Sequence, residues 1–256
     1  MTRPWRSAAD DAAREPRPPR LLASLLTTSM RFGASSATVD LWYVDLDVTG
    51  EVLEGLRSWL SGDELARSQR LRSALARTRY IAGRAALRGV LAGRLGCSPT
   101  AVRFTYGKHG KPRLAGGPGD IDFNLAHSEG EAVVGLASGA AIGVDIEVPR
   151  PVHDIESLAR LVFSDVERRE LELASDPLRA FLNGWTRKEA YLKGLGLGLT
   201  VPLGEITVSL SATASLLASG LRNQAASSWR LLNATHPRAV VALAIGPADT
   251  VSGSGH

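Results

Sequence analysis

Three residues in the stretch WTRKEAYLK have side chains suited to metal or phosphate chemistry. Trp185, Glu189 and Lys193 follow one another at intervals of four, and in a helix this spacing places them on one face. A glutamate four residues before a lysine also forms a favourable ion pair on any helix surface. For this motif alone, a solvated salt bridge beside a packed tryptophan is therefore an alternative to a functional site.

A second group of acidic residues lies in the apolar run IGVDIE. Asp145 and Glu147 are two residues apart, so in a strand both carboxylates project from the same face. Two buried charges this close are costly unless a cation compensates them, and Mg²⁺ takes carboxylate oxygens together with water and substrate phosphates. Alternatively, the pair lies on the solvated face of an edge strand. With Glu189 as a third ligand and Lys193 beside it, the set predicts a metal and phosphate site.

Basic residues elsewhere could complete an anion site. Lys111 lies in the loop KHGKP, where an ammonium can reach a phosphate as a point charge. His127 follows a strand-like run and precedes Ser128, so both side chains could donate to an anion; a histidine with a structural role is the alternative. The arginines of the helical segment 63–95 form either a basic wall that faces phosphates or a solvated surface.

Other familiar motifs are incomplete in this chain. Ser128, His127 and Asp145 are the residue types of a hydrolytic triad, but no Gly-x-Ser-x-Gly turn surrounds the serine. The segment KGLGLGL follows a helical pattern where a dinucleotide fingerprint would follow a strand. A Walker A sequence is absent.

Composition sets the class of protein. The chain has 256 residues, of which 44% are hydrophobic, enough for one large domain or two compact halves. Its single cysteine, Cys97, excludes intramolecular disulfides and Cys-rich zinc sites and indicates a reducing compartment, hence a cytoplasmic protein. No apolar run resembles a signal peptide or a membrane span, so we expect no membrane partner. The net charge of +4 favours anionic partners.

The hydrophobic pattern predicts an α+β fold. The stretch TVDLWYVDLDV alternates as a strand does, three strand-like runs follow the helical segment between residues 121 and 148, and three more occur near the end of the chain. The sequence SDVE at Ser164 is a capping box, and Asp176 with Pro177 begins the helix that carries the first motif. We expect a flexible leader over 1–38, two similar halves over 39–140 and 141–248, and a flexible tail over 249–256.

The ordered motifs HGKPRL, FNLAHS, IGVDIE and WTRKEAYLKGLGLGLTVPL together resemble the 4′-phosphopantetheinyl transferases of the surfactin-synthetase-activating (Sfp) type. The tryptophan before KEA resembles the subgroup of polyketide and nonribosomal peptide pathways. The resemblance extends from about Trp59 to Leu203; each motif is weak alone, and the set is specific. It implies a monomer of two pseudo-symmetric halves, with coenzyme A bound as co-substrate in the cleft between them.

The resemblance also implies roles for individual residues. Asp145, Glu147 and Glu189 would hold Mg²⁺, or Mn²⁺ in its place, against the coenzyme A pyrophosphate. Lys193 would stabilise or protonate the departing 3′,5′-ADP, while Glu189, directly or through water, would help to deprotonate the attacking serine. Trp185 would serve as packing. The phosphate contacts would come from Lys111, from His127 at the 3′-phosphate, from Lys188, and from one or more of Arg79, Arg84 and Arg88.

This chain departs from the family pattern at two points. The family often has serine before the motif histidine, where this chain has Ala126, so one side-chain hydrogen bond to phosphate would be missing. The amino-terminal helical segment also lacks the aromatic-rich pattern of relatives, which leaves the arginine assignments open.

The implied reaction is attack by a carrier-protein serine on the β-phosphate of coenzyme A. The partners would be apo acyl or peptidyl carrier proteins of polyketide, nonribosomal peptide or fatty-acid synthases, which are acidic and would bind transiently to a basic surface. The alternative enzyme is another Mg²⁺-dependent transferase or hydrolase that acts on a nucleotide pyrophosphate. A nucleic-acid-binding protein is the non-catalytic alternative, but no binding motif occurs and aromatic residues make up only 5% of the chain.

Overall fold

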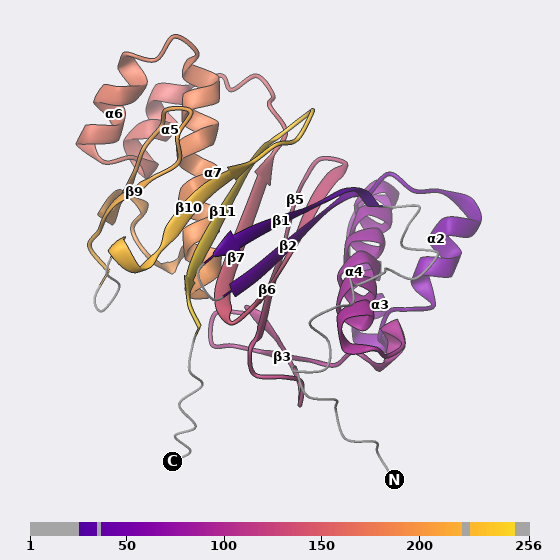
Figure 1. Ribbon diagram of the computed structural model, residues 1–256. Helices are drawn as coiled ribbons and strands as arrows, with labels where there is room; N and C mark the ends of the chain where they lie inside the picture. Colours follow the sequence, from indigo (N-terminus) through magenta and orange to yellow (C-terminus); the bar gives the residue numbers. More distant parts are fainter. Residues whose placement is uncertain (1–25, 35–36, 222–225, 249–256) are drawn as a thin grey trace.

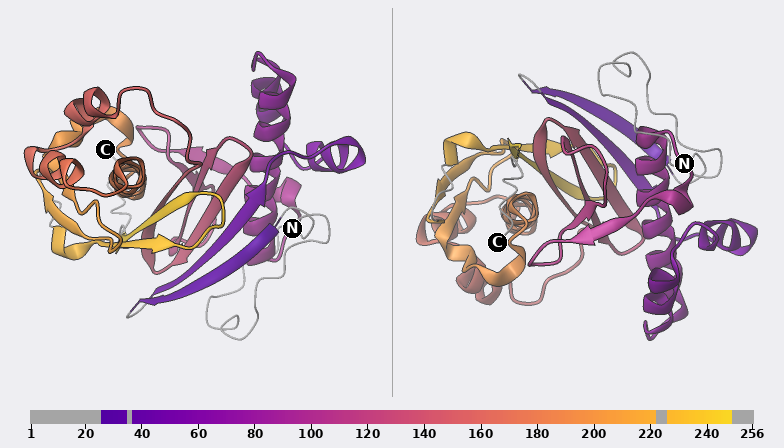
Figure 2. Two further views of the ribbon diagram at one scale, coloured as in Figure 1. Left: turned by 90° about the horizontal axis from the view of Figure 1, so that it is seen from above. Right: turned by 90° about the horizontal axis from the view of Figure 1, so that it is seen from below.

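Two antiparallel sheets lie side by side in the middle of the molecule, with helices on their outer flanks. The computed structural model describes residues 26–34, 37–221 and 226–248 (Figure 1). Helices α2 to α4 cover one flank and α5 to α7 the other, and this arrangement is visible along two further directions in Figure 2. The predicted α+β class is confirmed, and each half packs one long helix against its sheet.

The amino-terminal half contains a four-stranded sheet in the order β1-β2-β6-β5. The long helix α4 packs against it, and their shared core includes Trp42, Leu87 and Val134. The elements of this half are β1 (Leu26–Ala34), β2 (Ala37–Asp45), α2 (Gly50–Arg57), α3 (Gly62–Gln69), α4 (Ala74–Leu95), the 3₁₀ helix η2 (Pro99–Ala101), β3 (Phe104–Tyr106), β4 (Pro112–Leu114), β5 (Ile121–Ser128) and β6 (Glu131–Ser138).

The carboxyl-terminal half contains a three-stranded sheet in the order β10-β11-β7. The predicted boundary between the halves falls where β7 begins. The elements of this half are β7 (Ala140–Glu147), α5 (Ile155–Val162), α6 (Asp165–Glu172), α7 (Pro177–Leu195), the 3₁₀ helices η3 (Gly198–Thr200), η4 (Leu203–Glu205) and η5 (Ala226–Ser228), and the strands β8 (Ile206–Val208), β9 (Leu216–Ser219), β10 (Arg230–Ala234) and β11 (Val240–Pro247).

Capping residues define both ends of helix α7. The Asp176 side chain accepts a hydrogen bond from the Arg179 backbone N–H, and Pro177 occupies the first turn, where its missing N–H costs nothing. The helix ends at Gly196, whose φ of 69° favours glycine. The capping box predicted at Ser164 is also present and opens α6.

A close approach of backbones fixes α7 against β7. A Cβ atom at Gly143 would lie 1.9 Å from the Ala190 carbonyl oxygen and 2.3 Å from the Gly194 nitrogen, so only glycine fits there. The glycine of the IGVDIE motif therefore determines how near the helix lies to the strand that carries Asp145 and Glu147.

Side chains of β5 join the two sheets. Asp122 Oδ2 accepts from the Ile142 N–H at 2.8 Å, Asn124 Oδ1 accepts from the Val144 N–H at 2.9 Å, and Ser128 Oγ accepts from the Val148 N–H at 3.2 Å. Because alternate residues of a strand project to one side, every second residue of β5 can reach β7. We refer to these three hydrogen bonds as the β5–β7 joint.

The amino-terminal segment differs from expectation. The sequence predicted a flexible leader that continues to residue 38, whereas Leu26–Ala34 forms β1 and pairs antiparallel with β2. Pairing with β2 provides the backbone hydrogen bonds that this segment cannot make alone, and no local pattern signals that pairing. Residues 1–25 and the predicted tail over 249–256 lie outside the described residues. Within the described parts, no helix is long and apolar enough to cross a membrane.

Candidate active site

The structure brings the two acidic motifs together where β7 packs against α7. Asp145 and Glu189 are buried, with 5% and 9% of their surface exposed. Lys193 Nζ lies 2.5 Å from Asp145 Oδ1, so the ammonium predicted to face the metal site forms an ion pair with one of its carboxylates. The Lys193 side chain is 29% exposed and thus reaches solvent from this pair.

Burial and nearby charges raise the pKa values of two of the carboxylates. Burial raises the pKa of Asp145 to about 7; the Lys193 charge opposes this shift, and the charges of Glu189 and Glu147 add to it. Burial also raises the pKa of Glu189, again against the effect of Lys193, and the Glu147 charge adds to the shift. Such an arrangement of like charges favours protonation or a bound cation.

Two buried oxygens in this group lack partners. Among the described residues, neither Asp145 Oδ2 nor Glu189 Oε1 receives a hydrogen bond, and a buried carboxylate oxygen without a donor is costly. Hard oxygen donors of this kind suit Mg²⁺, so the residues present fit the predicted metal. Over the described ranges, however, no three His, Cys, Asp or Glu side chains are already assembled as a metal site, and the Lys193 ammonium takes Asp145 Oδ1 instead.

Glu147 has donors on both carboxylate oxygens. Ser128 Oγ donates to Oε2 at 2.7 Å, and Trp185 Nε1 donates to Oε1 at 3.3 Å. Trp185 was expected to act as packing alone, and its partly buried ring does pack against the carboxyl-terminal core. The i, i+4 spacing placed its indole on the face of Glu189, but nothing in the sequence indicated that the N–H would meet a carboxylate of β7.

His127 is an exposed basic residue that interacts electrostatically with Glu147 and Lys193. Although its ring reaches solvent, partial burial lowers its pKa, and the charges of Lys193 and Arg79 lower it further while that of Glu147 raises it. Arg79 lies on α4 and contacts two carboxylates, Asp47 at 2.7 Å and Glu129 at 3.4 Å. His127, Arg79 and Lys193 therefore form one basic neighbourhood at the end of β5.

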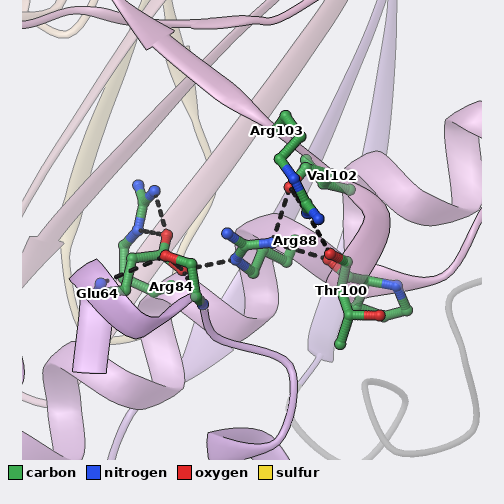
Figure 3. A network of polar contacts seen from close by, with 8 residues as sticks. Glu64, Arg84, Arg88, Thr100, Val102 and Arg103 are labelled. Atoms are coloured by element: carbon green, nitrogen blue, oxygen red, sulfur yellow. Dashed lines mark hydrogen bonds and ion pairs between the residues drawn. The ribbon is translucent and has the colours of Figure 1, made fainter.

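Arg84 and Arg88 do not face this neighbourhood. Both bind Glu64, with Arg84 Nη2 at 2.5 Å from Oε1 and Arg88 Nε at 2.7 Å from Oε2 (Figure 3). Arg88 also donates to the carbonyl oxygens of Pro99 and Val102. These contacts join α3 to α4 and to the segment after it. Arg84 and Arg88 are thus held by ion pairs with Glu64 in this structure, and the phosphate role predicted for them stays a prediction.

Lys188 is a structural residue in this fold. Its side chain is fully buried, and Nζ donates to Glu167 Oε2 at 2.6 Å and to the carbonyl oxygens of Val162 and Leu203. An ammonium has three donors, and these acceptors use all of them. Lys188 has no donor left for a ligand in this structure, and the phosphate contact predicted for it stays a prediction.

Lys111 also forms contacts within the protein. Its Nζ atom donates to Asp122 Oδ2 at 2.6 Å, to the Ile142 carbonyl oxygen at 3.1 Å and to the Gly194 carbonyl oxygen at 3.0 Å. The ammonium thus ties the loop before β4 to both halves at the end of α7. Every donor of the Lys111 ammonium is engaged inside the protein in this structure, and its phosphate contact stays a prediction.

A separate cavity lies away from these residues. A cavity of about 520 Å³ in the carboxyl-terminal half is lined by α6, the beginning of α7 and the segment after β8, including Glu170, Arg179 and Ser211. It contains none of the predicted site residues. The carboxylate group is therefore favoured as the site by its chemistry and not by the size of a pocket.

The sequence of this chain is similar to those of known proteins. Residues 141–244, which contain the carboxylate group and Lys193, match the family model of the 4′-phosphopantetheinyl transferase superfamily. The chain is 38% identical over 201 residues to the 4′-phosphopantetheinyl transferase HetI of Nostoc sp., a match that covers 77% of this chain and 82% of that protein. It is 30% identical over 171 residues to the 4′-phosphopantetheinyl transferase Sfp of Bacillus subtilis, covering 66% and 74% of the two chains. From the extent of these matches, the chain belongs to the 4′-phosphopantetheinyl transferase superfamily.

Proposed function

We propose that this enzyme transfers the 4′-phosphopantetheine arm of coenzyme A to a serine of an apo acyl or peptidyl carrier protein, releases 3′,5′-ADP and requires Mg²⁺. Family membership supports the transferase class. The observation that carries the metal-dependent chemistry is the buried group of Asp145 and Glu189 with an unpartnered oxygen on each, beside Glu147 and Lys193.

Asp145, Glu147 and Glu189 are the residues that would hold the metal. A bound Mg²⁺ would neutralise charge on the pyrophosphate and orient it. To release Asp145 Oδ1, the Lys193 ammonium must move away, and its partial exposure leaves solvent space for this. The same ammonium can then face the phosphate of the leaving group, so one movement would assemble both parts of the site.

The proton and phosphate steps follow from the residues present. As the serine oxygen bonds to the β-phosphorus, the bond from that phosphorus to the bridging oxygen breaks, and 3′,5′-ADP leaves with the bonding electrons. Glu189, whose pKa burial raises, accepts the serine proton directly or through water. Lys193 stabilises or protonates the departing phosphate, while His127 and Arg79 provide donors for the 3′-phosphate.

Charge and composition support the remaining features of the proposal. The basic chain, with a net charge of +4, would attract acidic carrier proteins of polyketide, nonribosomal peptide or fatty-acid synthases in transient encounters. We also propose a cytoplasmic location, which the single cysteine supports, and a monomer, which the resemblance to the family implies. The two halves are proposed to meet near residue 140, and Mn²⁺ is proposed to replace Mg²⁺ in the site.

Intact-protein mass spectrometry of an apo carrier protein tests this function. With enzyme, coenzyme A and MgCl₂ we expect a mass gain equal to one phosphopantetheine, which EDTA and the variant Glu189→Gln abolish. Glu172→Gln, at an exposed position near the end of α6, is the matched control and should retain activity. A folded enzyme that modifies none of several carriers, while it hydrolyses coenzyme A or another nucleotide pyrophosphate, would contradict the proposal.

A further inference from the structure

We infer that Ser128 and Trp185 are positioning residues that fix the orientation of the Glu147 carboxylate for metal binding. This inference rests on the proposed function, because it concerns a residue of the proposed metal site. It assigns roles to a strand residue of the amino-terminal half and a helix residue of the carboxyl-terminal half, neither of which is itself a proposed ligand.

The contacts define the plane of the carboxylate. Ser128 Oγ donates to Glu147 Oε2 at 2.7 Å, whereas Trp185 Nε1 donates to Oε1 at 3.3 Å. Rotation about the last side-chain bond of a glutamate is nearly free, but one donor on each oxygen selects a single orientation. Each carboxylate oxygen accepts two hydrogen bonds, so both retain a lone pair for a cation.

The Ser128 hydroxyl can point in one direction only. Its oxygen accepts the Val148 N–H at 3.2 Å as the last hydrogen bond of the β5–β7 joint, so its single proton is available for Glu147. The serine thereby places Glu147 relative to the neighbouring His127. A change in the joint would shift the carboxylate and the basic neighbourhood together.

The three carboxylates differ in the hydrogen-bond donors that their oxygens already have. Asp145 and Glu189 each carry an oxygen without a donor among the described residues, while Glu147 already has the two neutral donors named above. Outer groups that orient a metal ligand commonly account for about 10- to 100-fold in metal affinity. Glu147 would therefore be the ligand whose geometry is set before the metal arrives.

Binding of Mn²⁺, measured by electron paramagnetic resonance of the free ion in the presence of coenzyme A, tests this role apart from turnover. We expect Ser128→Ala and Trp185→Phe each to weaken binding about tenfold, and Ser128→Thr, which keeps the hydroxyl, to restore it. Trp229→Phe is the matched control, because the buried Trp229 Nε1 has no partner in the described structure, and its Mn²⁺ affinity should equal that of the wild type.

The outcomes separate the inference from the proposed function. If the wild type binds Mn²⁺ and the folded Ser128→Ala and Trp185→Phe proteins bind it equally well, the positioning role is overturned while the metal site stands. If the wild type binds no Mn²⁺, the proposed metal site is overturned and this inference with it. Thermal unfolding of each variant verifies that the compared proteins are folded.

Discussion

At the scale of single residues, Lys193 is the clearest candidate for a role in the transition state. Its ammonium is paired with the buried Asp145 in the free protein and would be redirected to the leaving phosphate only when substrate is bound. Interactions of this kind raise turnover more than affinity.

We therefore expect Lys193→Ala to lower kcat by about 10²- to 10³-fold and to change coenzyme A affinity far less. Steady-state kinetics and calorimetric binding of coenzyme A measure the two effects separately. Lys108→Ala, at an exposed loop lysine, should leave both values unchanged. Equal losses of turnover and affinity for Lys193→Ala would show that the lysine contributes to binding in general and has no special role in the transition state.

Residue types were easier to predict than residue roles. The carboxylates and Lys193 were predicted from two local motifs, one on a strand and one on a helix, and the shared metal and phosphate chemistry of the motifs joined them. The sequence could not distinguish basic residues that contact phosphate from those that form ion pairs within the protein. Arg84 and Arg88 form ion pairs with Glu64, and Lys188 forms one with Glu167. The partners in these pairs are 20, 24 and 21 residues apart in the sequence. No local pattern predicts a contact between side chains at such separations.

At the scale of elements, local signals identified most helices and strands. The capping box at Ser164 and the Asp176 and Pro177 pair mark the helix starts that the structure shows. The alternation in IDFNLAHS predicted β5, but it could not show that Asp122, Asn124 and Ser128 bond to β7. That contact depends on how the two sheets meet, which is a long-range property.

The β5–β7 joint gives a second interpretation of Ala126. The resemblance assigned a missing phosphate contact to this position, whereas Ala126 is buried and lies between two residues of the β5–β7 joint. All three bonds of the joint span 20 residues in sequence, so a side chain at 126 would face the Ile146 N–H. A serine at this position would therefore be placed to add a fourth hydrogen bond to the joint.

We expect Ala126→Ser to raise the free energy of unfolding by about 0.5–1.5 kcal/mol, the usual net value of one hydrogen bond. Asn124→Ala should lower it by about 1–3 kcal/mol, since the buried Val144 N–H loses its acceptor. Urea unfolding followed by circular dichroism measures both changes. Destabilisation by Ala126→Ser would mean that the added hydroxyl is buried without a partner and that the joint does not extend through this position.

At the scale of the whole molecule, the two halves form one folded unit. Leu41 and Val133 of the amino-terminal sheet share a hydrophobic core with Ile142, Val144 and Leu243 of the carboxyl-terminal sheet. Burial of this shared core would be lost if either half were separated. The site depends on this union, because Ser128 and His127 come from one half and the carboxylates from the other.

A second polar link between the halves lies at the turn from β10 to β11. The His236 side chain is buried; its ring packs edge-on against Tyr43, and its Nε2 atom lies 3.5 Å from Glu131 Oε2. The Arg238 N–H donates to His236 Nδ1 at 3.2 Å, which places the proton of the neutral ring on Nε2, toward Glu131. Arg238 forms an ion pair with the same glutamate.

This link predicts a specific dependence of stability on pH. Burial lowers the pKa of His236 below its ordinary value of 6.5; the Glu131 charge opposes the shift and the Arg238 charge adds to it. Below pH 6.5 the unfolded chain therefore binds a proton that the native ring does not. The free energy of unfolding consequently falls as the pH falls toward the native pKa, by at most about 1.4 kcal/mol per pH unit. His236→Gln, which cannot titrate, should reduce the loss of stability between pH 7 and pH 5 in urea unfolding. His153→Gln, at an exposed histidine, should retain the full loss. Parallel pH curves for the wild type and His236→Gln would show that folding does not lower the pKa of His236.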